Sequence, residues 1–304
     1  DRLGLLFGYC EFIANFFGFE INTVYKKMLE DAKVNKYAVP HFNINNLEWT
    51  RYILEECNRL KSPVILGVSE GAIRYMGGYK VVANLVKNLD EELNIQIPVA
   101  IHLDHGSSVE SCKKAVDAGF TSVMIDASKY SLEENIDMTK QVVEYARIKN
   151  ITIEAEIGHI GGSEDNMSSE IAYAKVDDAL SLYNETKIDF LAPALGSVHG
   201  LYKGEPCLDF DKMKEISEKT NIPLVLHGGT GIDDEKLKKA IASGICKVNI
   251  NTELQIAWTK AVRKFLSEDT KAYDPRTVIK SGEQSMKQAI EHKVNVLGSI
   301  NRIN

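Results

Sequence analysis

The stretch PVAIHLDHG (98–106) is a run of apolar residues that passes through histidine and aspartate and ends in glycine. A similar succession returns in FLAPALGSVHG (190–200) and in PLVLHGGTG (223–231). Near-continuous apolar runs of this kind are typical of strands buried on both faces of a parallel sheet. Three imidazoles at equivalent points of a repeated strand pattern are what an open catalytic zinc site needs. The pattern therefore indicates a metal enzyme.

The same kind of strand recurs outward from these stretches along the whole chain. The predicted strands are 37–42, 63–69, 98–104, 122–127, 152–158, 189–196, 222–228 and 246–250. Apolar residues at three- and four-residue spacing predict helices between them. These helices include 47–60, 108–119, 132–150, 209–220 and 233–244.

Eight strands that alternate with helices predict an α/β fold, the (β/α)8 TIM barrel, because eight parallel strands close a barrel. A doubly wound open sheet is the structural alternative. The barrel is expected to be a single domain over residues 22–304, with helices at its C-terminal end. Residues 1–21 are predicted to be an N-terminal extension of unclear status.

Composition narrows the class of protein. The 304 residues are 44% hydrophobic and 26% charged, which is typical of a globular protein with a large core. The formal charge is −7 and no basic block is present, which argues against nucleic acid or an anionic membrane as a partner. The aromatic first twenty residues contain acidic residues and fall short of a membrane span. Five widely spaced cysteines without a C-x-x-C pair favour a reducing, cytoplasmic location and a buried structural role for each.

Polar residues follow the predicted strands at their carboxyl ends, where the active site of such a barrel lies. They are Asn43, Asn45, Ser69, Asp104, His105, Asp126, Glu156, His199, His227, Asn249, Asn251 and Thr252. Asp104, beside a metal-ligating His105, is suited to general acid/base catalysis. The alternative is that Asp104 only caps the next helix or orients a ligand. If the strand persists to its end, these two side chains diverge.

The other histidines differ in their expected positions. His41, His159 and His292 resemble ordinary surface or loop residues. His102 precedes Asp104 by two residues, so it is expected on the same strand face, inside the barrel and below the site.

Two carboxylates alternate along one predicted strand, Glu154 and Glu156. Both are expected inside the barrel, where an unpaired charge is costly. One should therefore meet the metal region and the other a buried cation, for which Lys247 is the candidate.

Glycine-rich segments follow two of the three histidines. HGLYKG (199–204) and HGGTG (227–231) are interpreted as phosphate-binding loops, because small residues leave backbone N–H groups accessible. NINT (249–252) is a third candidate anchor. The polar segment 159–175 is the longest predicted loop, and loops of this length are lids or disordered segments.

Several motifs together resemble those of the class II, zinc-dependent fructose-bisphosphate aldolases, over about residues 22–300. They are LDHG, MIDAS, EAEIGHIGG, ALGSVHGLYKGEP, IPLVLHGGTGI and KVNINTE, in the family's order. The resemblance implies reversible cleavage of fructose 1,6-bisphosphate to dihydroxyacetone phosphate and glyceraldehyde 3-phosphate, and a homodimer or homotetramer. It also implies Zn²⁺, with a monovalent cation (Na⁺ or K⁺) often nearby.

The resemblance carries roles onto matching positions. It implies that His105, His199 and His227 bind zinc, that Asp104 is the acid/base, and that Glu164 on a mobile loop abstracts a proton. It implies that Asp126 and Glu156 serve an alternative metal position. Positions implied to contact substrate are Asn43, Ser69, Gly200, Lys203, Gly228, Gly229, Thr230, Asn249, Asn251 and Thr252. Gln255 stands where some members have an arginine, so Arg276 is the candidate anchor for the distal phosphate.

Four alternatives stay open at this point. The nearest is cleavage of tagatose 1,6-bisphosphate, whose enzymes share most of these motifs. The others are a Schiff-base aldolase that uses Lys247, a zinc hydrolase of the same fold, and a binding protein that keeps the fold without activity. The H-x-H pair usual on the first strand of barrel hydrolases is missing, which argues against the third.

Overall fold

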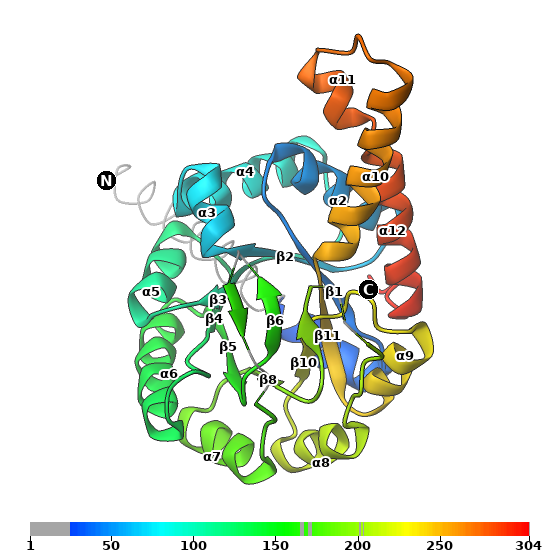
Figure 1. Ribbon diagram of the computed structural model, residues 1–304. Helices are drawn as coiled ribbons and strands as arrows, with labels where there is room; N and C mark the ends of the chain where they lie inside the picture. The colour runs from blue at the N-terminus through cyan, green and yellow to red at the C-terminus, as the bar shows by residue number, and fades with distance from the viewer. Residues whose placement is uncertain (1–24, 165–166, 170–171, 201, 203, 304) are drawn as a thin grey trace, which may run out of the picture.

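The strands close into a parallel barrel ringed by helices, as Figure 1 shows. The computed structural model describes residues 25–164, 167–169, 172–200, 202 and 204–303, so the predicted extension over 1–21 lies outside the described residues. In the described part, eight strands form the barrel in the order β1-β11-β10-β8-β5-β4-β3-β2. The predicted closed (β/α)8 barrel is thereby confirmed, and the open sheet is not the fold.

All eight predicted strands are present, with ends shifted by a few residues. They are β1 (Val39–Asn43), β2 (Val64–Ser69), β3 (Val99–Gly106), β4 (Ser122–Ile125), β5 (Thr152–Ile157), β8 (Phe190–Pro193), β10 (Leu224–Leu226) and β11 (Ile245–Ile250). β4, β5, β8 and β10 are buried throughout. Burial on both faces is the reason that β8 and β10 lack a polar alternation, whereas β5 alternates Glu154 and Glu156 with apolar residues.

The helices cover the outside of the barrel, and the five predicted ones are confirmed. They are α2 (Leu47–Arg59), α3 (Glu70–Met76), α4 (Tyr79–Glu92), α5 (Val109–Ala118), α6 (Leu132–Arg147), α7 (Val176–Thr186), α8 (Phe210–Thr220), α9 (Asp234–Ala242), α10 (Thr252–Glu268), α11 (Pro275–Lys280) and α12 (Glu283–Val296). Polar caps begin several of them; Ser131, for example, forms a capping box with Glu134 before α6. No helix in the described part is long and apolar enough to cross a membrane.

The amino-terminal end of the barrel is closed by apolar side chains. Residues 25–35 are helical, and Tyr25, Met28 and Leu29 from this helix join a buried cluster with strand residues such as Val39 and Phe190. The interior at the opposite end is polar instead. The barrel is therefore sealed at one end and carries chemistry at the other.

A second, smaller sheet belongs to the segment that was predicted as the long loop 159–175. β6 (Gly161–Glu164) and β7 (Met167–Ser169) pair antiparallel, and β6 pairs in parallel with β9 (Val198–His199). Part of this segment is therefore a hairpin rather than a structureless loop. Figure 1 shows β6 over the centre of the barrel. Backbone pairing joins it to β9, the strand that carries His199.

Candidate metal centre

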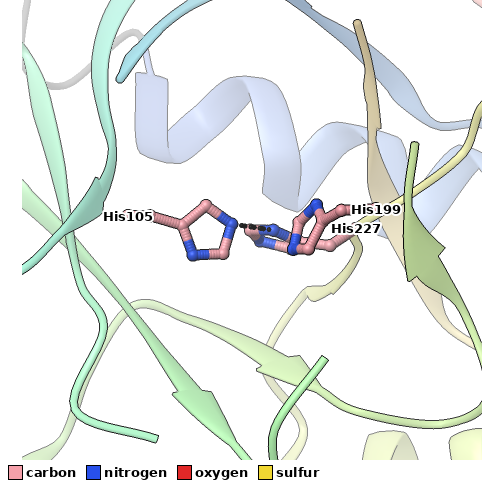
Figure 2. Close-up of side chains that lie close together, drawn as sticks. All are labelled: His105, His199 and His227. Atoms are coloured by element: carbon pink, nitrogen blue, oxygen red, sulfur yellow. Dashed lines mark hydrogen bonds between the residues drawn. The ribbon is translucent and has the colours of Figure 1, made fainter. Parts of the chain in front are cut away.

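Three imidazoles meet at the carboxyl end of the barrel, from β3, β9 and the residue after β10 (Figure 2). The ring nitrogens of His105, His199 and His227 lie within 4.8 Å of one another. The ring centroids are 4.6 Å apart for His105 and His227, 4.8 Å for His105 and His199, and 5.7 Å for His199 and His227. The rings are nearly perpendicular, so they surround a common point rather than stack. This convergence is the geometry that three ligands of one ion require.

In two of the three rings, one nitrogen faces the shared point and the other nitrogen contacts a carboxylate. His105 Nε2 lies 2.8 Å from His227 Nδ1, and His105 Nδ1 lies 2.7 Å from Asp126 Oδ2. His227 Nε2 lies 2.9 Å from Glu154 Oε1. A carboxylate accepts the imidazole N–H, which leaves the other nitrogen with its lone pair toward the centre. The residues present therefore fit a divalent ion.

The backbone at His105 explains how two adjacent residues both serve this end of the barrel. His105 has φ of +50°, in the left-handed region, and the β3–β4 register shifts between Leu103 and Gly106. This irregularity is a bulge, which re-aims a side chain. Sequence alone predicted only that Asp104 and His105 diverge.

Asp104 is buried and held by two amides, one from β1 and one from β11. Asn43 Nδ2 donates to its Oδ2 at 2.8 Å, and Asn249 Nδ2 donates to its Oδ1 at 3.2 Å. Burial opposes ionisation, but the imidazoles of His41 and His105 outweigh it and keep the Asp104 pKa well below its usual value. Asp104 is thus an oriented carboxylate at neutral pH.

His41 is not a surface or loop residue, and this expectation was wrong. It is fully buried in β1, with Nε2 3.6 Å from Asp104 Oδ2. Its ring occupies the space beside Gly67, where a Cβ would lie only 1.7 Å from Nε2. The available signal was its spacing of two residues from Asn43, which places both on one strand face.

The other histidines are placed as follows. His102 is buried below the site, as predicted, and its Nδ1 lies 2.8 Å from Ser122 Oγ. His292 is half-exposed on α12, as predicted. His159 lies in the segment leading to β6, but its Nδ1 contacts Ser128 Oγ at 2.8 Å. Ser128 also donates to Asp126, so His159 joins the polar surroundings of the centre.

The two carboxylates of β5 divide as the sequence predicted. Glu154 pairs with Lys247, Nζ to Oε2 2.7 Å, and both side chains are fully buried. Glu156 lies toward the centre instead, with Oε2 3.8 Å from His105 Nδ1. Burial and the neighbouring Asp126 raise the Glu156 pKa well above its usual value. Within the described residues, Glu156 Oε2 is buried without a hydrogen-bond partner, as expected of a group that awaits a cation.

Asp126 and His105 form a second possible donor set with Glu156, close to the first. Burial would raise the Asp126 pKa, but the hydrogen bonds from His105 and Ser128 lower it well below its usual value. Burial lowers the His227 pKa to about 4, against the opposing effect of Glu154. Burial also lowers the His199 pKa well below its usual value. A neutral imidazole keeps the lone pair that a metal ligand needs, so both rings suit metal binding near neutral pH.

The segments predicted to bind phosphate lie against each other beside the centre. Gly229 N donates to Asn249 O at 2.8 Å, and Glu253 N donates to Thr230 Oγ1 at 3.2 Å. Asn251 and Thr252 form the start of α10, whose first-turn N–H groups suit an anion.

Gly228 is required for close packing against β9, in addition to its predicted contact with substrate. Its φ is +65°, and a Cβ there would lie 2.1 Å from Val198 O in β9. Tyr202, which sequence reasoning overlooked, ties the same two segments: its hydroxyl accepts from Val198 N at 3.1 Å and donates to Gly228 O at 3.0 Å.

Comparison with known proteins then assigns the chain to a family. The model of the family "Fructose-bisphosphate aldolase class-II" matches residues 23–302. This chain belongs to the class II fructose-bisphosphate aldolase family. It is 57% identical over 275 residues to a fructose-bisphosphate aldolase of Geobacillus stearothermophilus, covering 90% of this chain and 96% of that protein. It is 54% identical over 278 residues to one of Staphylococcus aureus, covering 91% and 97%.

Solved structures of aldolases share the fold of this class II family member. The YdjI aldolase from Escherichia coli K12 superposes with a TM-score of 0.79 at 31% identity, covering 91% of this chain and 97% of that one. A putative fructose-1,6-biphosphate aldolase from Coccidioides immitis gives a TM-score of 0.80 at 28% identity, covering 90% and 96%.

Some predicted site residues of this class II aldolase family member are placed elsewhere or not described. Arg276 does not reach the barrel mouth of its own chain. It lies on α11, away from the ring of helices in Figure 1, with its side chain 90% exposed and paired with Asp274. The reason is local: the D-P-R sequence begins α11, where Asp274 caps the Arg276 N–H.

The remaining positions complete the site of this family member. Ser69 is nearly buried and caps α3 through a hydrogen bond from Ala72 N. Gly200 directly follows β9 with φ of +81°. Lys203 lies outside the described residues. Glu164 ends β6, and the placement of its side chain is likewise outside the description.

Proposed function

We propose that this protein is a zinc-dependent aldolase that reversibly cleaves fructose 1,6-bisphosphate to dihydroxyacetone phosphate and glyceraldehyde 3-phosphate. The observation that carries the proposal is the convergence of His105, His199 and His227 beside the buried, amide-held Asp104. The names of its relatives in Geobacillus and Staphylococcus support the substrate.

His105, His199 and His227 would hold the zinc, with Asp126 and Glu156 as donors for a second position of the ion. When bound, the ion supplies an electrophile that draws electron density from the breaking carbon–carbon bond. Any monovalent cation would lie close to the phosphate-binding segments.

Asp104 takes the hydroxyl proton of the sugar during cleavage and returns it during condensation. Asn43 and Asn249 hold the two carboxylate oxygens, so the orientation of Asp104 is fixed before substrate arrives. Glu164, on the hairpin, handles the carbon-bound proton. The hydroxyl proton and the carbon-bound proton are thus handled by two different carboxylates.

Phosphate at the dihydroxyacetone end is bound by the two glycine segments and the start of α10. The binding groups would be Gly200, Lys203, Gly228, Gly229, Thr230, Asn249, Asn251 and Thr252, with Asn43 and Ser69 nearer the sugar. Binding remote from the reacting bond keeps the reacting atoms in register. Arg276 could meet a distal phosphate only in an assembly of chains, since its own barrel mouth is out of reach.

The Schiff-base alternative is opposed by the position of Lys247. Its ammonium is fully buried beneath the centre and paired with Glu154 at 2.7 Å. A Schiff-base lysine must instead present a neutral amine to the substrate carbonyl.

A homodimer or homotetramer in the cytoplasm completes the proposal. Its structural support is the part of the chain formed by α10 and α11, which leaves the ring of helices in Figure 1 and carries a 92% exposed Tyr273. Light scattering on the purified protein would measure the assembly.

One assay tests the proposed function. Cleavage of fructose 1,6-bisphosphate is measured before chelation, after removal of the metal, and after zinc is added back, with tagatose 1,6-bisphosphate in parallel. Activity is expected to vanish and return, with fructose bisphosphate preferred. Activity that survives metal removal, or that borohydride traps with substrate, contradicts the mechanism, and a preference for tagatose bisphosphate contradicts the substrate.

A further inference from the structure

A buried ion pair lies directly beneath His227 and takes no part in the chemistry proposed above. Glu154 comes from β5 and Lys247 from β11, and neither side chain is exposed. Oε2 of Glu154 accepts from Lys247 Nζ at 2.7 Å, while Oε1 lies 2.9 Å from His227 Nε2. One carboxylate therefore joins a buried cation to one of the three candidate ligands.

The pair joins two strands of the barrel that are not neighbours. β8 and β10 separate β5 from β11 in the strand order, so the contact between Glu154 and Lys247 crosses the interior. His102 faces the same carboxylate from β3, with Nε2 3.6 Å from Oε2. Glu154 is thus held from several sides and has little freedom to turn.

Stability alone does not explain a buried pair of this kind. Removing two charges from water is costly, and packed apolar residues of similar volume often stabilise a protein equally well or better. The surrounding interior is rich in apolar residues such as Val39 and Phe190. A pair placed here is better explained by what it does to its neighbour.

The neighbour is an imidazole with two possible tautomers. Because a carboxylate can only accept, Glu154 requires the proton of His227 on Nε2. The lone pair is then on Nδ1, which lies 2.8 Å from His105 Nε2 in the space the three rings share. The opposite tautomer would direct an N–H group at that space.

We propose that Glu154 and Lys247 are positioning residues for the metal centre: Glu154 fixes the tautomer and orientation of His227, and Lys247 fixes Glu154. The inference rests on the proposed function, because it assumes that His227 binds the ion. It assigns the pair no contact with substrate.

The test compares metal affinity with stability in a double-mutant cycle. The full chain is prepared as wild type, Glu154→Met, Lys247→Met and the double variant. For each, the zinc dissociation constant is measured by competition with a chromogenic chelator, and the unfolding midpoint of the metal-free protein in denaturant is measured separately. Lys293→Met is the control, since Lys293 is also buried and paired, with Glu253 at 3.2 Å, away from the three imidazoles.

A positioning role and a purely structural role predict different patterns of zinc affinity and stability across the variants. We expect both single variants to unfold at lower denaturant and the double variant to recover, because no charge is left unpaired. Zinc binding should be 10- to 100-fold weaker, by order of magnitude, in Glu154→Met and equally weak in the double variant. Lys247→Met should weaken it less, since Glu154 still accepts from His227. The Lys293→Met variant should bind zinc as wild type does.

Two results would overturn the inference in different ways. If zinc affinity recovers with stability in the double variant, or never changes, the pair is only structural. If wild-type protein binds no zinc, the metal centre itself is wrong and the inference falls with it. Chelator competition separates these outcomes without any measurement of turnover.

Discussion

His105 and His227 are held by the barrel, whereas His199 is held by a small sheet above it. The first two extend from or follow barrel strands, and a carboxylate contacts the far nitrogen of each ring. His199 lies on β9, which pairs with β6 of the hairpin that ends in Glu164. The barrel therefore fixes two ligands, whereas the third pairs through its backbone with Gly162, on the strand that ends in the predicted proton-abstracting residue.

This difference shows how one site can combine a fixed arrangement of ligands with access for the substrate. Parts of a centre that set geometry belong on packed strands, while parts that admit substrate belong on segments that can open. Movement of the hairpin would displace Glu164 and His199 together and leave Asp104 in place. The following predictions test whether the two regions are separable in this way.

The largest effect is expected in the barrel-held region, at its acid/base residue. Asp104→Ala should lower the rate of fructose 1,6-bisphosphate cleavage by about 10²- to 10⁴-fold, because proton transfer to the sugar hydroxyl is lost. Zinc content should stay at the wild-type level, since Asp104 is not among the three imidazoles. Steady-state kinetics and metal analysis measure the two; normal turnover would refute the role of Asp104.

The next effect is expected where the two regions meet. Gly228→Ala adds a Cβ that would lie 2.1 Å from Val198 O, so β9 and His199 must shift. A displacement of about 1 Å in a site costs about 10²-fold in rate, and zinc affinity should fall as well. Gly204→Ala is the control for zinc affinity, because no atom lies within 4 Å of its added Cβ. Equal behaviour of the two variants would show that β9 does not depend on this contact.

A third comparison uses the ligands themselves, in metal-free protein. His227→Ala leaves Glu154 Oε1 without its partner in the interior, which should cost about 1–3 kcal/mol in the free energy of unfolding. His199→Ala removes a half-buried ring from the small sheet and should cost less than about 0.5 kcal/mol. Denaturant titration of both variants gives the difference. Similar losses would mean that β9 is as much part of the core as β10.

The smallest effect concerns pH and the histidine beneath Asp104. Burial, followed by the charge of Lys247, lowers the His41 pKa below its usual value. In the unfolded chain the imidazole of His41 binds a proton near pH 6.5, whereas in the folded protein it stays neutral at that pH. The free energy of unfolding therefore falls as the pH drops below that value. His41→Gln should reduce this slope by up to about 1.4 kcal/mol per pH unit. Unfolding at pH 7 and pH 5 measures it, with His292→Gln as the surface control; an unchanged slope would contradict the assignment.

Much of the barrel could be predicted from the chain because its signals are local. Short, largely apolar runs mark the barrel strands, and parallel strands bring their carboxyl ends to one mouth. The same logic located His105, His227 and Asp104, and it predicted that one of the two carboxylates of β5 meets a buried cation, with Lys247 as the candidate.

The features that could not be predicted depend on long-range or backbone detail. The bulge at His105 comes from the register between β3 and β4, and no single residue specifies it. His199 was expected at a barrel strand end but lies on β9, whose partner β6 has the sequence GGSE without an apolar alternation. Arg276 was chosen by residue type, which does not reveal that α11 leaves the barrel.

Because the ring of His41 packs against Gly67, the size of the side chain at one of these positions limits the size at the other. The ring of His41 fills the place that any side chain at position 67 would need. Interiors this closely packed do not tolerate both side chains at once. A family member with a larger residue in place of Gly67 on β2 should therefore have a smaller one in place of His41 on β1. We expect the two positions to change together, and a substitution at one to be tolerated only with the matching substitution at the other.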